Sequence, residues 1–168
     1  MTLEALYNNM VEVADNLENG QLVRVVVSQH GDDVIELQQY QLLQGKAANG
    51  EDMRPYYSED LQPAGYFRST ESAKLYADWK QTLSYPRQAQ RNADAPNLYI
   101  NGKFHNDLVV NFGPQYASID GATTYGQMII SKYGKDKFGL TAENWNEIMR
   151  NRGGYDELLN TIKKMIWR

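Results

Sequence analysis

Apolar residues recur at intervals of three and four near the beginning of the chain, which is the spacing of one face of an α-helix. They are Leu3, Leu6, Tyr7, Met10, Ala14 and Leu17. Thr2 is suited to cap the start of this helix, and Asn19-Gly20 is suited to end it. The valine-rich segment 22–28 follows that turn and fits either a strand or a helical connector, so its pattern leaves both open.

A second helical pattern begins near residue 32, where Asp32 or Asp33 can serve as the N-cap. Its apolar positions lie among glutamines and are Ile35, Leu37, Leu42 and Leu43. Gly45 and the Asn49-Gly50 pair are suited to end it, because glycine readily adopts the left-handed backbone that follows many helices. Amphipathic stripes of this kind indicate packing against a core.

Residues 46–97 lack a sustained period and are rich in proline and aromatic residues. One short helix is predicted from Thr70 to Leu83, with Tyr76 and Trp79 on its apolar stripe together with Leu83. So long an aperiodic segment is usually functional or disordered, and the aromatic content favours order. Because tyrosine is enriched at interfaces, we expect subunit or partner contacts here. The candidate contact residues are Tyr56, Tyr57, Tyr66, Phe67, Trp79 and Tyr85.

The clearest strand signal lies between residues 98 and 120. Leu108–Phe112 and Gln115–Asp120 flank Gly113-Pro114, which predicts a hairpin closed by a tight turn. Two-residue alternation places apolar side chains on one face of this pair, and they are Leu108, Val110, Phe112, Ala117 and Ile119.

Two capped helices are predicted after the hairpin. The first begins at Thr123 or Thr124 and ends at Gly134, a glycine suited to the position after a helix C-terminus. The second begins after Thr141 as N-cap, and its flanking residues Leu140 and Trp145 can form a hydrophobic staple.

The last helix is expected after Gly153-Gly154, opened by Tyr155 or Asp156. Its apolar stripe consists of Leu158, Leu159, Ile162 and Ile166. The whole pattern predicts an α+β fold for residues 1–168 as a single domain, with N-terminal helices, a small antiparallel hairpin and C-terminal helices. Residues 46–97 form its long aromatic loop region, which contains prolines and one short helix.

The composition excludes several classes of protein and of functional site. The 168 residues are 42% hydrophobic, enough for one compact core, and the formal net charge of −4 does not suit a general nucleic-acid binder. The chain has no cysteine, which excludes disulfides, zinc–cysteine sites, iron–sulfur clusters and thiol nucleophiles. The longest clean apolar run, Val25–Val27, is far below the roughly 18 residues of a membrane span. The first five residues lack the features of a signal peptide.

Motifs for chemistry are scarce. Nucleotide loops, zinc-protease, hydrolase and calcium-loop motifs are missing from the sequence. His105 and Asp107 could serve a metal or a proton transfer, but without a third ligand nearby we expect a helix-start or turn motif whose polar residues satisfy backbone groups. His30 is expected to be a turn residue. The acidic pairs Asp32-Asp33 and Glu59-Asp60 fit helix starts or loops better than nuclease carboxylates. A solvated helix end, and no phosphate site, is expected for Lys132, Lys135 and Lys137. We therefore expect no enzyme, no cofactor and no metal site.

The order of motifs from residue 45 to 150, with the helix before it, resembles small virion-morphogenesis proteins of tailed bacteriophages, particularly forms from phages of Bacteroides-like hosts. The segments that carry the resemblance are a glutamine-rich helix (35–45), NGEDMRPYYS (49–58), YADWK (76–80), PNLYINGKFHNDL (96–108), the hairpin, and KYGKDKFGLT (132–141). One departure is Asn101, where the family commonly has threonine before the glycine. The N-terminal 30 residues and the long aromatic insert match less well.

This resemblance implies a structural virion protein of the phage neck or tail. Such tail-completion or head–tail joining proteins look like ring-forming connector subunits, typically sixfold, made in the cytoplasm of a bacterial host and located in the virion. The expected partners are copies of the same chain in a hexameric ring, and neighbouring neck and tail proteins on the portal or adaptor side and on the tail-tube side. DNA would be passing cargo only, and no membrane is involved.

Two alternatives from other classes stay open. One is a small monomeric phage-encoded binding module, an inhibitor or adaptor that uses the Tyr56–Tyr85 surface, which predicts a stable monomer with an exposed aromatic patch. The other is a nucleic-acid enzyme that uses His105 and Asp107, for which His105→Ala would abolish an activity and leave folding intact.

Overall fold

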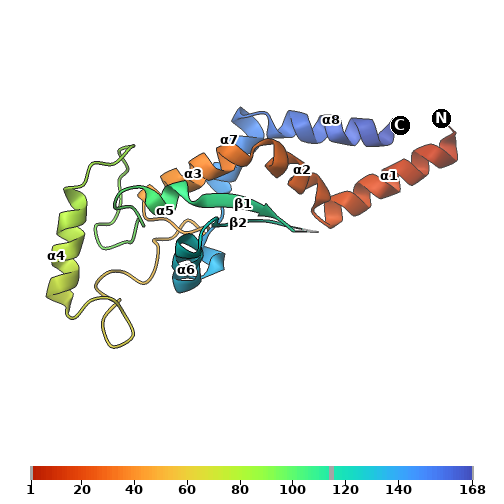
Figure 1. Ribbon diagram of the computed structural model, residues 1–168. Coiled ribbons are helices and arrows are strands. Elements are labelled where there is room, and N and C mark those ends of the chain that lie inside the picture. Colours follow the sequence, from red (N-terminus) through yellow and green to blue (C-terminus); the bar gives the residue numbers. More distant parts are fainter. Residues whose placement is uncertain (1, 114–115, 168) are drawn as a thin grey trace.

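The computed structural model describes residues 2–113 and 116–167, and it shows an elongated, mainly helical molecule with one antiparallel strand pair (Figure 1). Its elements are α1 (Leu3–Glu18), α2 (Gln21–Gln29), α3 (Gly31–Leu43), α4 (Thr70–Gln81), α5 (Lys103–Asn106), β1 (Leu108–Phe112), β2 (Ala117–Gly121), α6 (Thr124–Tyr133), the 3-10 turn η1 (Lys135–Lys137), α7 (Ala142–Asn151) and α8 (Gly154–Ile166). The predicted α+β class is confirmed.

The first three helices follow one another almost without a break. Thr2 caps α1 as predicted, since its hydroxyl accepts from the backbone N–H of Ala5. Gly20, with φ of 75°, makes the turn into α2. The valine-rich segment left open between strand and helix is helical, because Leu22 and Val26 lie one turn apart and are both buried. Tertiary packing here overrides the weak helix propensity of valine.

The predicted N-cap of α3 is wrong. His30 occupies that position without a side-chain cap bond, and α3 already begins at Gly31. Asp33 turns its carboxylate to the His30 ring, with 2.9 Å between Oδ2 and Nδ1, and to Arg152. Both predicted aspartates therefore lie in the first helical turn, where negative charge is favourable to the helix dipole. Gly45, with φ of 68°, follows the helix end as predicted.

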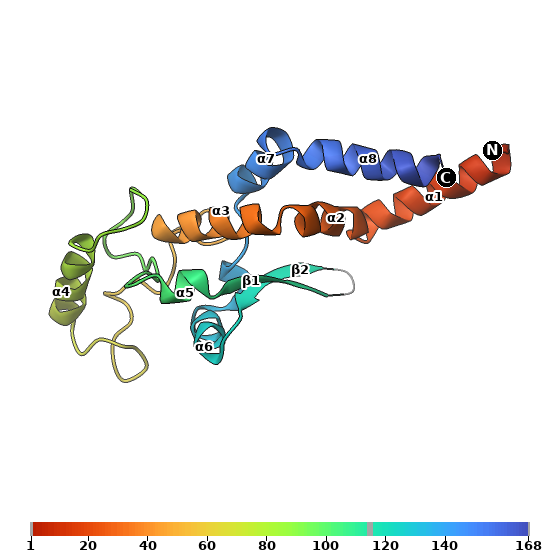
Figure 2. The ribbon, with the colours of Figure 1, turned by 45° about the horizontal axis from the view of Figure 1, so that its top comes forward.

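The helices and the hairpin form three layers (Figure 2). The run of α2 and α3 lies in the middle, the hairpin packs on one side, and α7 and α8 lie on the other. The register pairs Val110 with Ile119 and Phe112 with Ala117, which confirms the predicted face. Strand β2 begins two residues later than expected, and the predicted turn at Pro114 lies outside the described residues.

Two buried glutamines attach α3 to the start of α7. The amide of Gln41 donates to the carbonyl of Gly139 at 2.9 Å, while its oxygen accepts from the backbone N–H of Thr141 at 2.9 Å. Gln38 accepts from the backbone N–H of Gly139, also at 2.9 Å. Thr141 is thereby held where it caps α7 through the N–H of Asn144. Since buried polar groups need partners, these bonds fix a unique arrangement of the main core.

The main core gathers residues from α2, α3, the hairpin, α6 and α7. Its most deeply buried members include Val26, Leu42, Met53, Phe104, Ile130 and Ile148. The predicted cap Thr123 and the predicted stop Gly134 frame α6 as expected, with Gly134 at φ of 93°. We refer to α3, the hairpin, α6 and α7 together as the body.

The loop region 46–97 is ordered. Its helix α4 begins after Ser69, which forms a capping box with Ser72, and ends at Gln81, two residues before the predicted end. Asp94 ties the two ends of the region together, because it accepts from the backbone N–H and the hydroxyl of Ser58. A second, smaller core lies under α4 and contains Tyr57, Phe67, Ala73 and Ala77.

Candidate functional site

The helices α1 and α8 lie side by side at the end of the molecule opposite α4 (Figures 1 and 2), and we call them the α1/α8 layer. The side-chain amide of Asn9 donates to the carbonyl of Ile166 at 3.0 Å across the pair. The layer is poorly covered, since Val13 is the buried residue of α1 and Gly154 that of α8. The two helices contact each other, and most of the side chains on the rest of their surface are not buried.

The uncovered side of α1 is apolar. Leu3, Tyr7 and Met10 follow one another at helical spacing and are 85%, 67% and 56% exposed. In α8, which begins at Gly154 and so earlier than expected, the predicted stripe residue Leu159 is also half exposed, whereas its neighbour Leu158 packs against the main core. Contiguous exposed apolar surface of this kind marks an interaction site in soluble proteins.

Charge distinguishes α1 from the rest of the chain. It holds four acidic residues and no lysine or arginine, and the acidic residues are Glu4, Glu12, Asp15 and Glu18. Because the whole chain has a net charge of −4, the formal charges of all residues outside α1 sum to zero. The apolar stripe of α1 is therefore carried on a strongly acidic helix.

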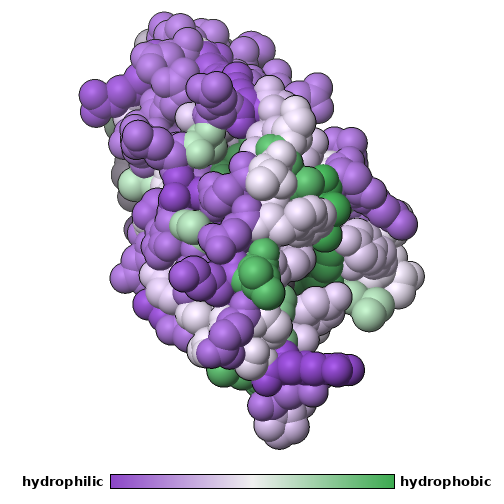
Figure 3. All heavy atoms as spheres, turned by 90° about the vertical axis from the view of Figure 1, so that its left-hand side faces the viewer, coloured by the Kyte–Doolittle hydropathy of each residue, from purple (hydrophilic) through white to green (hydrophobic). Residues whose placement is uncertain are grey.

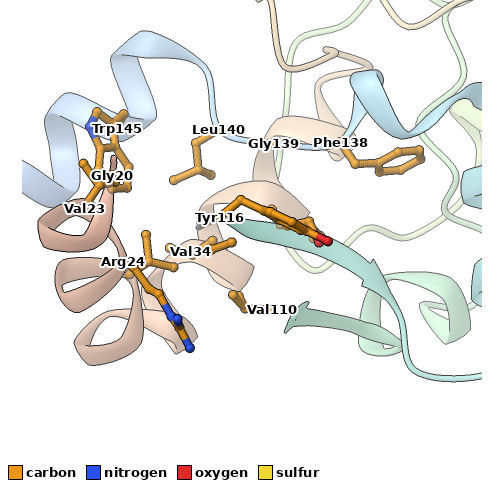
Figure 4. Close-up of a pocket in the computed structure, with 14 residues that line it drawn as sticks. Gly20, Val23, Arg24, Val34, Val110, Tyr116, Phe138, Gly139, Leu140 and Trp145 are labelled. Carbon is orange, nitrogen blue, oxygen red and sulfur yellow. The ribbon is translucent and has the colours of Figure 1, made fainter. Parts of the chain in front are cut away.

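An open apolar groove of about 390 Å³ adjoins the base of this layer (Figure 4). Its walls come from α2, the hairpin and the chain that leads into α7, and they include Val23, Val110, Ile119, Leu140 and Trp145. Gly20, at the junction of α1 and α2, also lines it. The guanidinium of Arg24 lies at the groove and stands 5.8 Å from the centre of the Phe112 ring. Apolar surface thus extends from the body to the C-terminal end of α1.

The structure separates the six aromatic residues predicted as contacts. Tyr57 and Phe67 are 6% and 7% exposed, and their rings meet edge to face with centroids 5.8 Å apart. Both also pack against Tyr76, at 5.1 and 5.2 Å. The prediction that Tyr57 and Phe67 form intermolecular contacts is therefore corrected, because their aromatic area is buried inside the subunit.

The other four predicted contacts keep some surface. Tyr66 and Trp79 are 72% and 44% exposed, whereas Tyr56 and Tyr85 are half-buried. The guanidinium of Arg54 covers the ring of Tyr56 at 3.7 Å, and the hydroxyl of Tyr85 donates to the carbonyl of Lys80. The α4 end accordingly presents hydrophilic side chains interrupted by a band of apolar ones, as Figure 3 shows.

A cavity of about 270 Å³ lies beneath α4, between the loop region and α6, and we call it the aromatic cavity. Its walls include Tyr57, Tyr76, Leu98, Tyr125, Tyr133 and Lys80. Leu98 has a φ of 52°, in the left-handed region that few leucines adopt. Most of the lining side chains are aromatic or alkyl, and one of the polar ones is a buried amine.

That amine belongs to Lys80, which is 1% exposed. Its Nζ donates to the carbonyl of Tyr99. Burial, together with the smaller effect of the positive charge of Arg91, lowers the pKa of Lys80 to about 7. The sequence analysis missed this residue, although Ala73, Ala77 and Lys80 share one helical stripe, which is the signal that could have found it.

A salt bridge stands beside the aromatic cavity. Nζ of Lys132 lies 2.7 Å from Oδ2 of Asp60, and both residues line the cavity. The same ammonium group is 5.7 Å from the centre of the Tyr66 ring and 5.5 Å from that of Tyr133. Two lysines and one carboxylate thus contribute formal charge to the cavity wall.

His105 and Asp107 have structural roles. Nε2 of His105 lies 2.9 Å from the carbonyl oxygen of Asn97, and burial lowers the pKa of the imidazole to about 4. Asp107 accepts from the backbone N–H and the hydroxyl of Thr123, at 3.1 and 2.9 Å. Within residues 2–113 and 116–167, no group of three or more possible protein ligands could hold a metal ion. His105 lies in the short helix α5 and Asp107 is its C-cap, and both side chains bind backbone groups, as expected.

The remaining charged candidates are paired. Lys135 and Lys137 contact Asp120 and Asp136 at 3.2 and 3.0 Å, as Lys132 contacts Asp60. Arg152 bridges Asp33 and Glu36. The pKa of the Asp33 carboxyl is lowered by its hydrogen bonds with His30 and then with Arg152, and that of the Glu36 carboxyl by its hydrogen bond with Arg152. These groups hold elements of the fold together.

No helix in the described part of the chain is long and apolar enough to cross a membrane. No family model, no curated protein and no solved structure matches this chain. The resemblance to phage morphogenesis proteins therefore rests on the order of the sequence motifs and stays a prediction.

Proposed function

We propose that this chain is a non-enzymatic assembly subunit that associates with copies of itself. In the setting that the motif order implies, it is a structural virion protein of the phage neck or tail, a ring-forming tail-completion or head–tail connector subunit. The observation that carries the proposal is the uncovered apolar side of the α1/α8 layer, where Leu3 and Tyr7 are mostly exposed. A monomer that kept this surface in water would forgo the burial that stabilises most helices.

The size of the surface fits an interface. Since α1 has 16 residues, it measures about 24 Å by about 10 Å, so two such helices side by side present roughly 500 Å². Stable interfaces bury about 800 Å² on each partner. The α1/α8 layer together with the adjoining groove approaches that area.

The shape of the subunit supports a ring. Its two ends differ, with an apolar and acidic α1/α8 layer at one and the aromatic α4 region at the other (Figure 1). A ring requires contacts between different surfaces of successive subunits, and an elongated subunit with unlike ends provides them. The placement between capsid neck and tail tube, and the sixfold number, come from the motif resemblance alone.

The test is the molar mass of the full chain by light scattering over a concentration series. A discrete mass near six subunits of 19.2 kDa is expected, and Met10→Asp should shift the chain to monomer because a carboxylate would be buried at the contact. Met128→Asp is the matched control, since Met128 in α6 is 67% exposed, similar to Met10. It should assemble as the natural chain does.

A chain that stays monomeric at every concentration, alone and mixed with portal or tail-tube proteins, overturns the proposal. That result would favour the monomeric binding module, for which the exposed rings of Tyr66 and Trp79 are the available surface. The enzyme alternative gains nothing from the geometry, because His105 is buried and Asp107 is occupied by Thr123.

A further inference from the structure

The aromatic cavity combines aromatic walls with a buried amine. Half of its lining residues are aromatic, and its one fully buried charged side chain, Lys80, has a backbone carbonyl as hydrogen-bond acceptor. We propose that this cavity binds a small aromatic carboxylate, whose ring lies among the tyrosines and whose carboxylate accepts from Nζ of Lys80. This site is separate from the α1/α8 layer and does not depend on the proposed assembly.

The amine of Lys80 lacks an anionic partner. Among the described residues no carboxylate lies within ion-pair distance of its Nζ. An ammonium group carries three donors, and the carbonyl of Tyr99 takes one. A buried charge is costly unless it is paired. A bound carboxylate would supply the anionic partner that the chain does not provide for the ammonium group of Lys80.

The charges around the cavity select an anion. Lys132 and Asp60 form a salt bridge and offset each other, which leaves the amine of Lys80 as the unbalanced group. A box of tyrosines alone would suit a quaternary ammonium ligand through cation–π contacts. With Lys80 in the wall, a cationic ligand would meet a like charge.

The volume suits a single ring. An apolar cavity of about 150 Å³ accommodates benzene in a protein core. The aromatic cavity measures about 270 Å³ and so has room for one ring and a carboxylate. The walls that would flank the ring come from three different elements: Tyr57 from the loop, Tyr76 from α4 and Tyr133 from α6. Edge-to-face contacts already present between Tyr57 and Tyr76 show that these rings are held in position.

Binding should be coupled to proton uptake. With its pKa lowered to about 7 by burial, Lys80 is mostly neutral at pH 8, and a bound carboxylate would favour its charged form. The ionisable groups that line the cavity or are packed around Lys80 are Tyr57, Asp60, Tyr66, Tyr76, Tyr85, Arg91, Tyr99, His105, Tyr125, Lys132 and Tyr133. The buried tyrosines Tyr57, Tyr76 and Tyr133 have raised pKa values and stay neutral over the same range. An uptake of about 0.9 proton per ligand is therefore expected at pH 8, and about 0.1 at pH 6.

The experiment uses the full chain and benzoate as the probe, followed by NMR shifts of the cavity residues and by calorimetry. Benzamide is the neutral match and benzylamine the cationic one. We expect saturable binding of benzoate at millimolar concentration, at least tenfold tighter than benzamide at pH 7, with benzylamine weaker still. Calorimetry at pH 8 in buffers of different ionisation enthalpy measures the proton uptake.

Two variants separate recognition from folding. Lys80→Met keeps the length of the side chain and removes the amine, so it should reduce the preference for benzoate over benzamide to less than twofold. Lys74→Met is the matched control, because Lys74 lies on the exposed side of the same helix. It should bind benzoate as the natural chain does, with the same proton uptake.

Three outcomes would overturn the inference. They are the absence of saturable benzoate binding, equal affinity for benzoate and benzamide, and an unchanged preference in a folded Lys80→Met chain. None of them bears on assembly, since α1 and α4, which contributes to the cavity wall, lie at opposite ends of the molecule (Figure 1) and the molar mass is measured without a probe.

Discussion

The body and the α1/α8 layer are built from the same kind of amphipathic helix, yet the apolar faces are buried in the body and exposed in the layer. In the body, Leu42 of α3 and Ile148 of α7 are fully buried and belong to one continuous core. In the layer, Leu3 and Tyr7 of α1 and Leu159 of α8 stay exposed. Periodicity therefore identifies the apolar face of a helix, but the element that covers this face has to come from elsewhere in the chain or from another molecule.

Polar contacts show the same contrast. Gln38 and Gln41 bind the body together through buried hydrogen bonds to the 139–144 segment. Between the two helices of the layer, the side-chain amide of Asn9 donates to the backbone carbonyl of Ile166 near the C-terminus of α8. Regions with few buried contacts open at lower free energy than the core. We therefore expect the layer to gain most of its order from assembly.

The largest expected effect compares Ile148→Ala with Leu159→Ala. Ile148 is 0% exposed, so its truncation should lower the free energy of unfolding by about 3 kcal/mol. Leu159 is 50% exposed, so its truncation should change the stability of the dilute monomer by less than about 0.5 kcal/mol. Urea denaturation at low protein concentration measures both.

The same pair should rank in the opposite order when assembly is measured. Leu159→Ala is expected to raise the concentration at which oligomers form, while a folded fraction of Ile148→Ala should still assemble. If Leu159→Ala costs as much stability as Ile148→Ala in the monomer, the layer is part of the core and the comparison fails.

Much of the body could be predicted from the sequence because its signals are local. Caps such as Thr123 and Thr141 act within one helical turn, and alternation in 108–112 fixes the face of the strand. The start of α3 could not, because only His30 separates α2 from α3 and Asp33 contacts His30 and Arg152, which lies more than a hundred residues later in the chain. Long-range partners of that kind leave no trace in a local pattern.

The next effect in size comes from replacing the buried amine. Lys80→Met should raise the free energy of unfolding at pH 7 by about 2 kcal/mol, because a buried cation without a carboxylate partner is exchanged for an apolar side chain. Thermal unfolding of the free chain measures the gain. Lys74→Met, on the exposed side of α4, should change little.

The pH dependence of that gain has a definite sign. The pKa of Lys80 is about 7 in the folded chain and near 10.5 when unfolded, so between these values the unfolded chain binds more protons. Stability of the natural chain should therefore rise with pH from 7 to 9.5, and the advantage of Lys80→Met should shrink over the same range. If the gain in free energy of unfolding does not change between pH 7 and 9.5, Lys80 is charged over this whole range.

The site residues were harder to predict than the fold. The density of aromatic residues in 46–97 indicated that some of them pack together, but it could not tell Tyr57 and Phe67, which are buried, from Tyr66 and Trp79, which are exposed. That distinction depends on how the loop folds back over α4. Lys80 was overlooked because lysine is usually exposed, so its apolar helical position was the only clue.

A smaller effect is expected where α3 meets the end of α7. Arg152 contacts the carboxylates of Asp33 and Glu36, which are both partly exposed, so Arg152→Gln should cost about 1 kcal/mol at pH 7. The pKa of both carboxyls is lowered, so this stabilisation is present above their ordinary pKa and lost as pH falls through the lowered values. Urea midpoints at pH 7 and pH 3 should show the difference between variant and natural chain narrowing in acid. A constant difference would assign the role of Arg152 to packing.

The smallest effect is also the sharpest comparison, because one chemical change is made in both regions. Thr141 caps α7 in the body and Thr2 caps α1 in the layer, each by accepting from a backbone N–H at 3.2 Å. Thr141→Ala should lower the free energy of unfolding by about 1 kcal/mol, since α7 unfolds together with the core. Thr2→Ala should leave it nearly unchanged in the monomer, where α1 can fray independently, and should instead speed amide hydrogen exchange across 3–10. Equal losses of stability would show that α1 unfolds cooperatively with the body before any partner covers it.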